Sequence, residues 1–310
     1  MTQSRMTRRH VLIAGAALPA VAGLAPTAAL AAAEMKGASG ALHNRFKLGG
    51  FEVTTLLAGT RTVEKPTEIF GLNAAPEVFA RVSAANFLPT DKAQFFFTPT
   101  VVNTGSELVL FDTGLSAAGI TAALAQAGYQ PDQIDVVVLT HMHGDHIGGL
   151  MGEAGVTFPN ARYVTGAAEH NHWMGAGNGG FDKSVRPLND RIAFLDDGGS
   201  VAAGITAMAA FGHTPGHMAY AIESAGQRVV LIADAANHYV WSVGQPDWEV
   251  RFDMDKPAAA ATRRRLLGML AVDRVPFIGY HMSFPALGYV EPAGDAFRYV
   301  PASYQMMLQG

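Results

Sequence analysis

The feature that most constrains this fold is a buried strand that runs directly into a cluster of histidines. Residues 134–139 are largely apolar and rich in β-branched side chains, which predicts a strand covered on both faces. Such a strand needs further layers of structure on either side of it. Helices are predicted at residues 119–127, before this strand, and at 257–270, near the end of the chain. The chain is therefore predicted to form a layered α/β fold.

Further strands are expected on both sides of this central strand. Two hairpins are predicted, one from residues 46–48 and 51–57, and one from residues 95–103 and 107–111. The second half has strand patterns at residues 162–165, 205–209, 218–223, 228–232 and 275–279. The segment 66–92 is less regular, with a short helix near 76–84, and 167–181 is an irregular segment rich in glycine and histidine. No linker divides the rest, so residues 34–310 are expected to form one domain.

The histidine cluster after the central strand has the spacing of a metal site. His141 and His143 lie two residues apart in an extended segment, so their side chains point the same way. After Gly144 the chain turns towards a helix, which places Asp145 and His146 beside a second ion. Nitrogen and oxygen ligands without thiolates suit zinc or another first-row ion, with manganese, cobalt or iron as alternatives.

Four local ligands cannot complete two coordination spheres, so more must come from distant segments. His213 and His217 lie in one short turn, His-Thr-Pro-Gly-His. Asp234 ends an apolar strand, where an acid is costly to bury unless it is paired or bound to metal. His281 follows the final apolar strand in the same way.

The first 33 residues look unlike the rest and are predicted to be an export signal. Arg5, Arg8 and Arg9 precede a run of Ala, Gly, Leu and Val that ends in small residues, and the segment contains no acid. The stretch 7–12 resembles a twin-arginine signal. A membrane anchor is the alternative, although Pro19 and Pro26 weaken it. We expect a periplasmic or secreted protein with no stable membrane insertion after the signal is removed.

Composition excludes several classes of chemistry. The 310 residues contain no cysteine, which excludes disulfides, thiolate metal sites and a cysteine nucleophile. The formal net charge is −4, and removal of the signal takes three arginines away. A nucleic-acid partner is therefore not expected, because such proteins normally carry a basic face. A small-molecule substrate is expected, and a homodimer is left open.

The segment 141–146 resembles the His-x-His-x-Asp-His signature of the metallo-β-lactamase superfamily of dinuclear metal hydrolases. The resemblance implies a four-layer αββα sandwich with the metal site at the strand ends. It implies that His141, His143 and His217 hold one ion and that Asp145, His146 and His281 hold the other. Asp234 would bridge the two ions, and His213 would support the turn from behind. Antibiotic-cleaving members generally lack this aspartate, and many use a cysteine ligand.

A closer resemblance is to the methyl parathion hydrolase-like branch, through residues 102–106, 127–131, 212–217, 281–288 and 297–301. It implies hydrolysis of small neutral esters or lactones, with organophosphate triesters as a further substrate. The alternatives are an N-acyl homoserine lactone lactonase, a thioester hydrolase of glyoxalase II type, and a metal-binding or iron redox member without hydrolysis. Many lactonases have a tyrosine three residues after the bridging acid. Asn237 stands there in this chain, with Tyr239 as a substitute.

The mechanism expected from this resemblance needs no serine or cysteine nucleophile. Two adjacent cations lower the pKa of a bridging water, and the resulting hydroxide attacks a carbonyl carbon or a phosphorus. Asp145 and Asp234 are the expected catalytic carboxylates, with Asp145 orienting the nucleophile. The substrate pocket is expected to include Trp173, Phe181, Asn237 and His238. Arg263, Arg264 and Arg265 are expected to form a solvated helix face.

Overall fold

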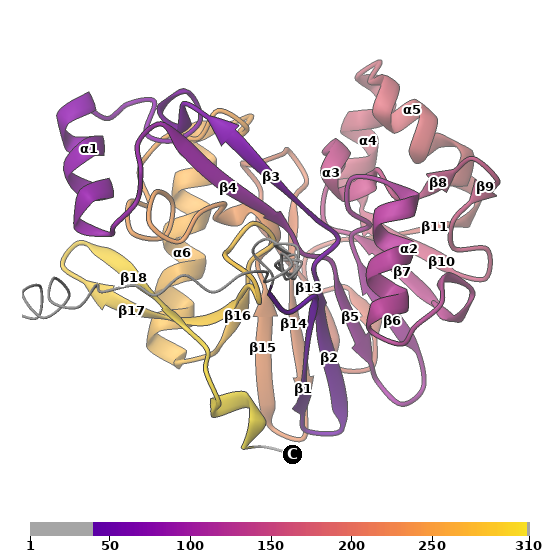
Figure 1. Ribbon diagram of the computed structural model, residues 1–310. Coiled ribbons are helices and arrows are strands. Elements are labelled where there is room, and N and C mark those ends of the chain that lie inside the picture. The colour runs from indigo at the N-terminus through magenta and orange to yellow at the C-terminus, as the bar shows by residue number, and fades with distance from the viewer. Residues whose placement is uncertain (1–39, 309–310) are drawn as a thin grey trace, which may run out of the picture. The chain divides into compact units, whose positions relative to one another are not determined.

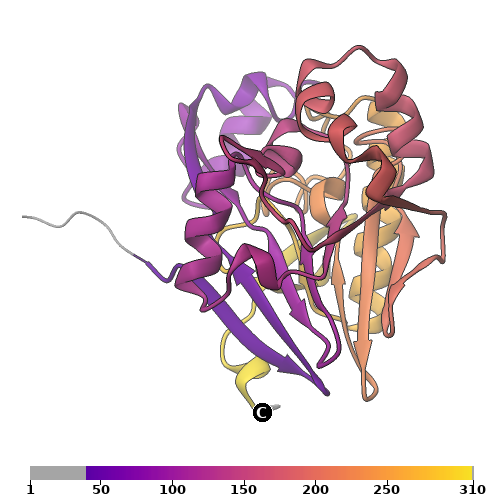
Figure 2. The ribbon, with the colours of Figure 1, turned by 90° about the vertical axis from the view of Figure 1, so that its right-hand side faces the viewer.

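The computed structural model describes residues 40–308, and the export signal predicted for residues 1–33 lies outside them. Two seven-stranded sheets pack face to face in this part of the chain (Figures 1 and 2). The first sheet has the order β1-β2-β5-β6-β7-β10-β11, and the second has the order β12-β13-β14-β15-β16-β17-β18. The two sheets are thus built from successive stretches of chain, apart from the short strands named below.

The first sheet changes from antiparallel to parallel pairing at its centre. Its strands are β1 (His43–Leu48), β2 (Phe51–Leu56), β5 (Thr100–Asn103), β6 (Leu108–Phe111), β7 (Val136–Leu139), β10 (Arg162–Gly166) and β11 (Ile192–Leu195). Neighbours pair antiparallel from β1 to β6 and parallel from β6 to β11. All four residues of β7 are buried, as its apolar sequence predicts.

The second sheet is antiparallel except for one parallel pair. Its strands are β12 (Ser200–Ala202), β13 (Ile205–Ala209), β14 (Met218–Ser224), β15 (Gln227–Leu231), β16 (Phe277–Ile278), β17 (Leu287–Ala293) and β18 (Ala296–Pro301). The parallel pair is β15 with β16, so the segments after these two strands leave the sheet at the same edge. This arrangement brings Asp234 and His281 to one end of the molecule.

Three apolar layers identify the fold as an αββα sandwich. One lies between the sheets and includes Val138 and Tyr220. The second lies under α2 (Ala117–Gln126), α4 (Ala167–Gly175) and α5 (Gly179–Ser184), outside the first sheet. The third lies under α6 (Lys256–Asp273), outside the second sheet. The predicted four-layer class is confirmed.

A separate hairpin lies above the sheets and forms a fourth apolar cluster with α1 (Pro76–Ala85). It consists of β3 (Gly59–Glu64) and β4 (Lys92–Phe97), which pair only with each other. The single strand predicted over 95–103 was therefore wrong, because the chain breaks at Thr98-Pro99 and continues in the first sheet as β5. Pro99 has no backbone N–H to donate to a sheet ladder, so a break there follows from its chemistry.

The predicted helices are found with small shifts of their ends. Ser116 accepts a hydrogen bond from the N–H of Gly119 at the start of α2, and Asp255 accepts one from Ala258 at the start of α6. The irregular segment predicted over 167–181 instead contains α4 and the start of α5. Short elements complete the fold: α3 (Gly144–Ile147), β8 (Met151–Gly152), β9 (Gly155–Val156) and the 3-10 turns η1 (Pro66–Glu68), η2 (Pro131–Gln133), η3 (Arg186–Arg191), η4 (Ala233–Ala235) and η5 (Gln305–Met307).

No helix between residues 40 and 308 combines the length and apolar character that crossing a membrane requires.

Candidate metal centre

The local histidine cluster lies where β7 ends and α3 begins. His141 and His146 are buried, and His143 is partly buried at the first residue before α3. The Nε2 atom of His141 lies 3.1 Å from Nδ1 of His143, as expected for side chains two residues apart. The rings of His141 and His146 have centroids 3.9 Å apart. The predicted local geometry is therefore present.

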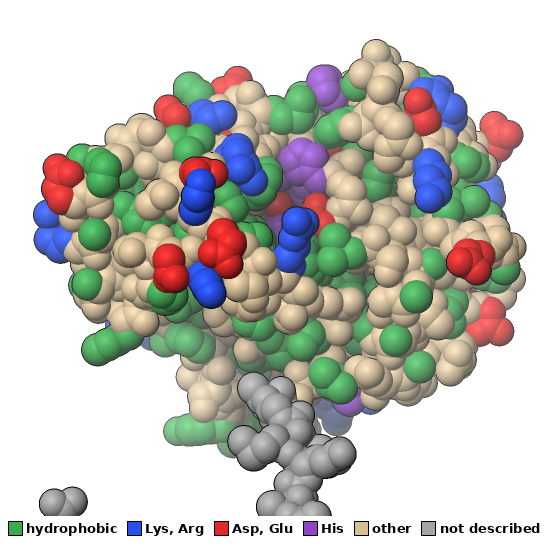
Figure 3. All heavy atoms as spheres, turned by 45° about the horizontal axis from the view of Figure 1, so that its top comes forward, with side chains coloured by type: hydrophobic (Ala, Val, Ile, Leu, Met, Phe, Trp, Pro, Cys, Tyr) green, Lys and Arg blue, Asp and Glu red, His purple; other side chains and the backbone are tan. Residues whose placement is uncertain are grey.

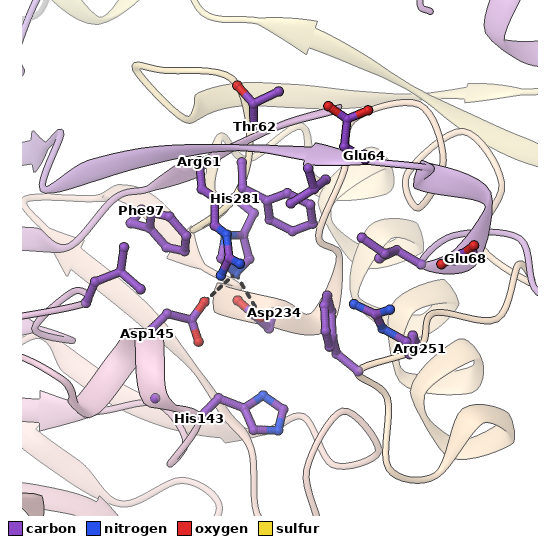
Figure 4. A pocket seen from close by; sticks show the side chains of 16 residues that line it. Arg61, Thr62, Glu64, Glu68, Phe97, His143, Asp145, Asp234, Arg251 and His281 are labelled. Carbon is purple, nitrogen blue, oxygen red and sulfur yellow. Dashed lines mark ion pairs between the residues drawn. The ribbon is translucent and has the colours of Figure 1, made fainter. Parts of the chain in front are cut away.

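Three residues from the second sheet meet this cluster. His213 lies in the loop between β13 and β14, Asp234 in η4 after β15, and His281 after β16. His146 Nε2 is 3.4 Å from Asp234 Oδ1, and His281 Nε2 is 3.2 Å from Asp234 Oδ2. His281 Nε2 is also 3.3 Å from Asp145 Oδ2. Figure 4 shows Asp145, Asp234 and His281 converging on one point.

The ligand atoms form three overlapping groups, each with its members within 4.8 Å of one another. They are His141, His143 and His213; His141, His146 and Asp234; and Asp145, His146 and His281. The group containing Asp234 shares His141 with one neighbouring group and His146 with the other. Asp234 therefore has possible metal-ligand atoms on both of its sides.

Two unpartnered buried atoms test whether a metal fits here. The buried Nε2 of His146 and Oδ1 of Asp234 face each other at 3.4 Å, but neither forms a hydrogen bond in the structure. A buried polar atom without a partner normally carries a cost of about 1–3 kcal/mol, which metal coordination would remove. His143 Nδ1 also lies 3.0 Å from His213 Nε2, so several ring nitrogens face one another without enough acceptors. The residues present thus fit a divalent metal site.

The histidines of the cluster fall into two groups with shifted pKa values, because burial lowers the pKa of some and nearby carboxylates raise the pKa of others. Burial lowers the pKa of His141 well below its usual value and that of His143 to about 3, so both rings are neutral at pH 7. Burial acts the same way on His281, but the charge of Asp234 outweighs it and raises the pKa of His281 to about 10. Asp234 and Asp112 likewise raise the pKa of His146 well above its usual value against the effect of burial. Without metal, these two histidines carry the protons that balance the carboxylates.

Outer hydrogen bonds fix the orientation of three histidine rings. Asp112 Oδ2 lies 2.8 Å from His146 Nδ1, and Asp253 Oδ1 lies 2.8 Å from His213 Nδ1. A carboxylate can only accept, so both Nδ1 atoms donate and both Nε2 atoms are left free to bind a metal. His281 Nδ1 is 2.9 Å from the carbonyl oxygen of Phe96. The sequence analysis missed Asp112 and Asp253, although Asp112 ends an apolar strand just as Asp234 does.

Glu169 on α4 connects two of the loops that carry the histidine cluster. Its buried carboxylate accepts hydrogen bonds from the N–H of Met142 at 2.9 Å and from Thr214 Oγ1 at 2.7 Å. It also accepts from the N–H of Gly216 at 2.9 Å and from Trp173 Nε1 at 2.6 Å. One side chain therefore holds the segment 141–143 against the segment 213–217.

The geometry places His213, rather than His217, among the ligand atoms. His213 Nε2 lies 3.3 Å from Asp234 Oδ2 and 3.0 Å from His143 Nδ1. Both ring nitrogens of His217 are occupied, because Nδ1 lies 3.1 Å from the Ala210 carbonyl and Nε2 accepts from the N–H of Asp234. The expected roles of these two residues are thus exchanged: His217 supports the loop that carries Asp234.

Arg263 corrects the expectation of a solvated arginine face on α6. Its side chain is buried, and Nη2 pairs with Asp253 Oδ2 at 2.8 Å, directly behind His213. Its Nε donates to the carbonyl of Ala235, next to Asp234, at 2.8 Å. The other two arginines of the run, Arg264 and Arg265, are more exposed, and Arg264 pairs with Asp247. Arg263 therefore links α6 to the loops that carry His213 and Asp234.

A cavity of about 740 Å³ opens over the cluster, as the hollow containing histidine in Figure 3 shows. Its floor includes His143, Asp145, Asp234 and His281, and its walls include Phe95, Phe97 and Phe252. Its rim is formed by Arg61, Thr62, Val63, Glu64, Glu68, Ile69, Leu115, Gly144 and Arg251. The Asp145 side chain is about a quarter exposed, which leaves its carboxylate facing the cavity.

None of the four residues predicted for the substrate pocket lines this cavity. Trp173 and Phe181 are buried in the core under α4 and α5. Asn237 lies behind the floor, where its Nδ2 donates to Asp234 Oδ2 at 3.0 Å. His238 stacks on Trp241 and, with Tyr239, lines a second cavity of about 330 Å³ on the other side of β4. The hairpin β3–β4 forms the wall instead, which sequence periodicity could not reveal.

Comparison with known proteins identifies the family. Residues 98–276 match the family model of the metallo-beta-lactamase superfamily. The match covers more than half of the chain, so the chain belongs to this superfamily, as the resemblance of residues 141–146 predicted. The structural neighbours named below include a dizinc lactonase and a hydrolase, which agrees with the expected enzyme class.

Two solved structures share the fold over nearly their whole length. One is AidC, a dizinc quorum-quenching lactonase in complex with a product, with a TM-score of 0.78 and 24% identity over 85% of this chain and 98% of that chain. The other is the hydrolase AbOPH, with a TM-score of 0.79 and 23% identity over 86% of this chain and 100% of that chain.

A curated relative matches a shorter region. The exodeoxyribonuclease WalJ of Streptococcus pneumoniae serotype 2 is 39% identical over 49 residues, which is 16% of this chain and 18% of WalJ. The match thus spans less than a fifth of the length of that relative.

Proposed function

We propose that this chain is a dinuclear-metal hydrolase that cleaves small esters or lactones. The observation that carries the proposal is the position of the histidine and aspartate cluster at the floor of a cavity with aromatic walls. Hydrolysis at the cluster would take place at the bottom of the cavity, and the aromatic walls suit an apolar acyl or aryl group. The dizinc lactonase that shares this fold supports both the metal and the substrate class.

We propose that this cluster binds two divalent ions and that both are zinc. His141, His143 and His213 would hold one ion, Asp145, His146 and His281 would hold the other, and Asp234 would lie between them. When bound, such a pair supplies an activated water and polarises the oxygen of the scissile group. Nitrogen and carboxylate ligands without thiolates are the donor set that supports zinc.

The chain's own groups position the reactants. Asp145, held by His281 and partly open to the cavity, accepts a hydrogen bond from the attacking water and aligns it. Asp234 lies on the same floor but is almost fully buried, and it contacts His146, His213 and His281. Its role is therefore to hold the ligand set together. Phe95 and Phe97 hold the apolar part of the substrate and keep bulk water out of the cavity.

An N-acyl homoserine lactone lactonase is the second candidate. It is supported by AidC, whose structure contains N-hexanoyl-L-homoserine as the product. The position of Tyr239 weighs against a tyrosine-assisted form of this reaction. Tyr239 lines the second cavity, and among residues 40–308 no tyrosine lines the cavity over the cluster. Phosphotriesters and thioesters remain as further substrates to be compared.

A substrate panel on metal-loaded protein tests the proposal. Aryl esters, aliphatic lactones, an acyl homoserine lactone, a thioester and a phosphotriester are compared at equal concentration, with metal content measured by atomic spectroscopy. We expect esters or lactones to be cleaved fastest, with activity lost on chelation and restored by zinc. Two bound ions without hydrolysis anywhere on the panel would contradict the proposal.

We also propose that the enzyme is exported and acts in the periplasm or outside the cell. The basic start and apolar middle of residues 1–33 support this, as does the twin-arginine-type stretch 7–12. We further propose a small-molecule substrate, no nucleic-acid partner and no stable membrane insertion of the mature chain. Replacement of Arg8 and Arg9 by lysine should leave the unprocessed chain in the cytoplasm, whereas wild-type protein of lower mass appears in the periplasmic or secreted fraction. Unchanged export of that variant would refute the twin-arginine route.

A further inference from the structure

Two arginines border the cavity over the histidine and aspartate cluster. Arg61 projects from β3, above Asp145 and His281, and Arg251 projects from the segment before α6 (Figure 4). Within residues 40–308, neither guanidinium forms an ion pair with a carboxylate. The contact made by Arg251 is with the ring of Phe252, whose centroid is 4.9 Å away.

The acidic residues of the rim do not neutralise these arginines. Glu64 lies 3.9 Å from Lys92, and Glu68 lies 3.0 Å from Lys65, so each has its own partner. The two pairs cancel and leave the rim with the charges of Arg61 and Arg251. Figure 3 shows basic side chains at the border of the hollow.

The carboxylates on the cavity floor, Asp145 and Asp234, lie against His281 and His146, so the positive charge of the rim is not cancelled from below. The whole chain has a formal net charge of −4. A cleft with low-dielectric walls focuses the field of its charges and concentrates ligands of the opposite sign. Uncompensated guanidinium groups at the mouth of an aromatic-walled cavity therefore favour a ligand with an anionic end and an apolar body.

Protection of an exposed strand edge is a second explanation for a charged residue at this rim, but it applies to only one of the two arginines. Charged side chains on an exposed edge strand prevent unwanted pairing with other chains, and β3 has such an edge. That explanation accounts for Arg61 but not for Arg251, which lies outside any strand. A ligand that contacts both Arg61 and Arg251 explains why the two side chains border the same cavity.

We propose that the substrate carries a carboxylate that Arg61 and Arg251 bind, while its ester or lactone group lies over the cluster. This inference rests on the proposed hydrolase function and narrows its substrate class. A guanidinium matches a carboxylate through paired N–H donors, which a neutral amide of the same shape cannot use in the same way. Phe95, Phe97 and Phe252 would then hold the apolar part between the two polar ends.

The test compares two ligands that differ only in charge. The binding probes are 3-(4-ethoxyphenyl)propanoate and its primary amide, ethers that the enzyme cannot hydrolyse as esters. The matched substrates are 3-(4-acetoxyphenyl)propanoate and its primary amide, in which an acetate ester replaces the ethyl ether. Binding is measured by calorimetry on the full chain loaded with zinc, and hydrolysis is measured as kcat/KM.

Wild-type protein should prefer the carboxylate by about 10-fold in both assays, in keeping with hydrogen bonds to a charged group. The R61M/R251M variant should lose this preference, and R61K/R251K should recover part of it. The R81M/R274M variant removes the same amount of charge from residues that do not line the cavity, so it should keep the preference. High salt should weaken the preference in the wild type.

Equal binding of both probes by the wild type would overturn the proposal. A preference that survives in R61M/R251M would overturn it as well, because the carboxylate would then be bound at the cluster. Failure of the hydrolase function gives a different result. Neither acetate ester would then be hydrolysed, but the wild type would still bind the carboxylate probe more tightly than the amide and R61M/R251M would not.

Discussion

At the scale of single residues, the exchange between His213 and His217 has a measurable consequence. His213 Nε2 faces Asp234 and His143, whereas His217 Nε2 accepts a backbone N–H. We predict that His213→Gln lowers the number of tightly bound ions from two to about one. His217→Gln should leave two ions bound, because its side chain can still accept a hydrogen bond. Metal analysis after gel filtration measures both, and loss of an ion only in the His217 variant would reverse the assignment.

Local spacing predicted that the first four residues of the cluster lie together, but it did not predict which of these two histidines joins them. His141, His143, Asp145 and His146 lie in one short segment, so their directions follow from strand and helix geometry. His213 and His217 flank a Pro-Gly turn, and either could face the cluster. The choice depends on Asp253 and Ala210, which lie 40 and 7 residues away along the chain. Spacing alone carries no information about such partners.

Arg263 gives a second prediction at this scale. Its buried guanidinium neutralises Asp253 and also binds the carbonyls of Ala235 and Pro246. Arg263→Met should lower the free energy of unfolding by about 3–5 kcal/mol, because the buried Asp253 would lose its cationic partner and keep only the hydrogen bond from His213. The neighbouring Arg264→Met should cost about 1 kcal/mol or less, because its pair with Asp247 is exposed. Urea denaturation compares the two, and equal effects would contradict the buried pair.

The sequence did contain a signal for Arg263. Leu266, Leu267 and Leu270 follow it at the i+3, i+4 and i+7 positions, so Arg263 lies on the same stripe of α6 as the buried leucines. The run of three arginines suggested solvent instead, since long charged side chains are seldom buried without a partner. The partner, Asp253, lies outside the helix, where its periodicity could not indicate it.

At the scale of elements, α4 is packed tightly against the loop that carries His213. A Cβ at Gly216 would overlap the backbone nitrogen of Glu169 near the start of α4. We predict that Gly216→Ala destabilises the protein by about 3 kcal/mol, since neither backbone can move without the other, and that it weakens metal binding. Gly175→Ala is the control, because nothing lies within 4 Å of a Cβ at that position. Thermal unfolding and zinc titration of both variants provide the measurement, and similar behaviour of the two would count against tight packing.

The elements themselves were predictable where the chain has a strong local pattern. The apolar run of β7 and the hairpin β1–β2 were found close to their predicted ends. The hairpin β3–β4 was not, because β3 is largely exposed and has no apolar alternation. Its pairing with β4 depends on the apolar cluster with α1, Trp241 and Trp248, which are distant in sequence.

At the scale of the whole molecule, the cluster joins the two sheets. His141, His143, Asp145 and His146 follow a strand of the first sheet, and Asp234 and His281 follow strands of the second. Metal removal should therefore destabilise the entire sandwich rather than one loop. A ligand present at 100 times its dissociation constant stabilises a fold by about 2.7 kcal/mol per site. Scanning calorimetry with and without chelator should show one transition that moves to lower temperature, and an unchanged transition after verified metal loss would refute this coupling.

The hairpin β3–β4 has a further consequence for how such an enzyme could diversify. It belongs to neither seven-stranded sheet, yet it supplies Arg61, Phe95 and Phe97 to the cavity. The ligand-type side chains come from other segments. Side-chain changes in β3, such as at Arg61, can therefore alter which compounds enter, whereas β4 must keep its course because its Phe96 carbonyl orients His281. Residues 59–64 are thus a natural target for library-based engineering of a new substrate range over an unchanged cluster.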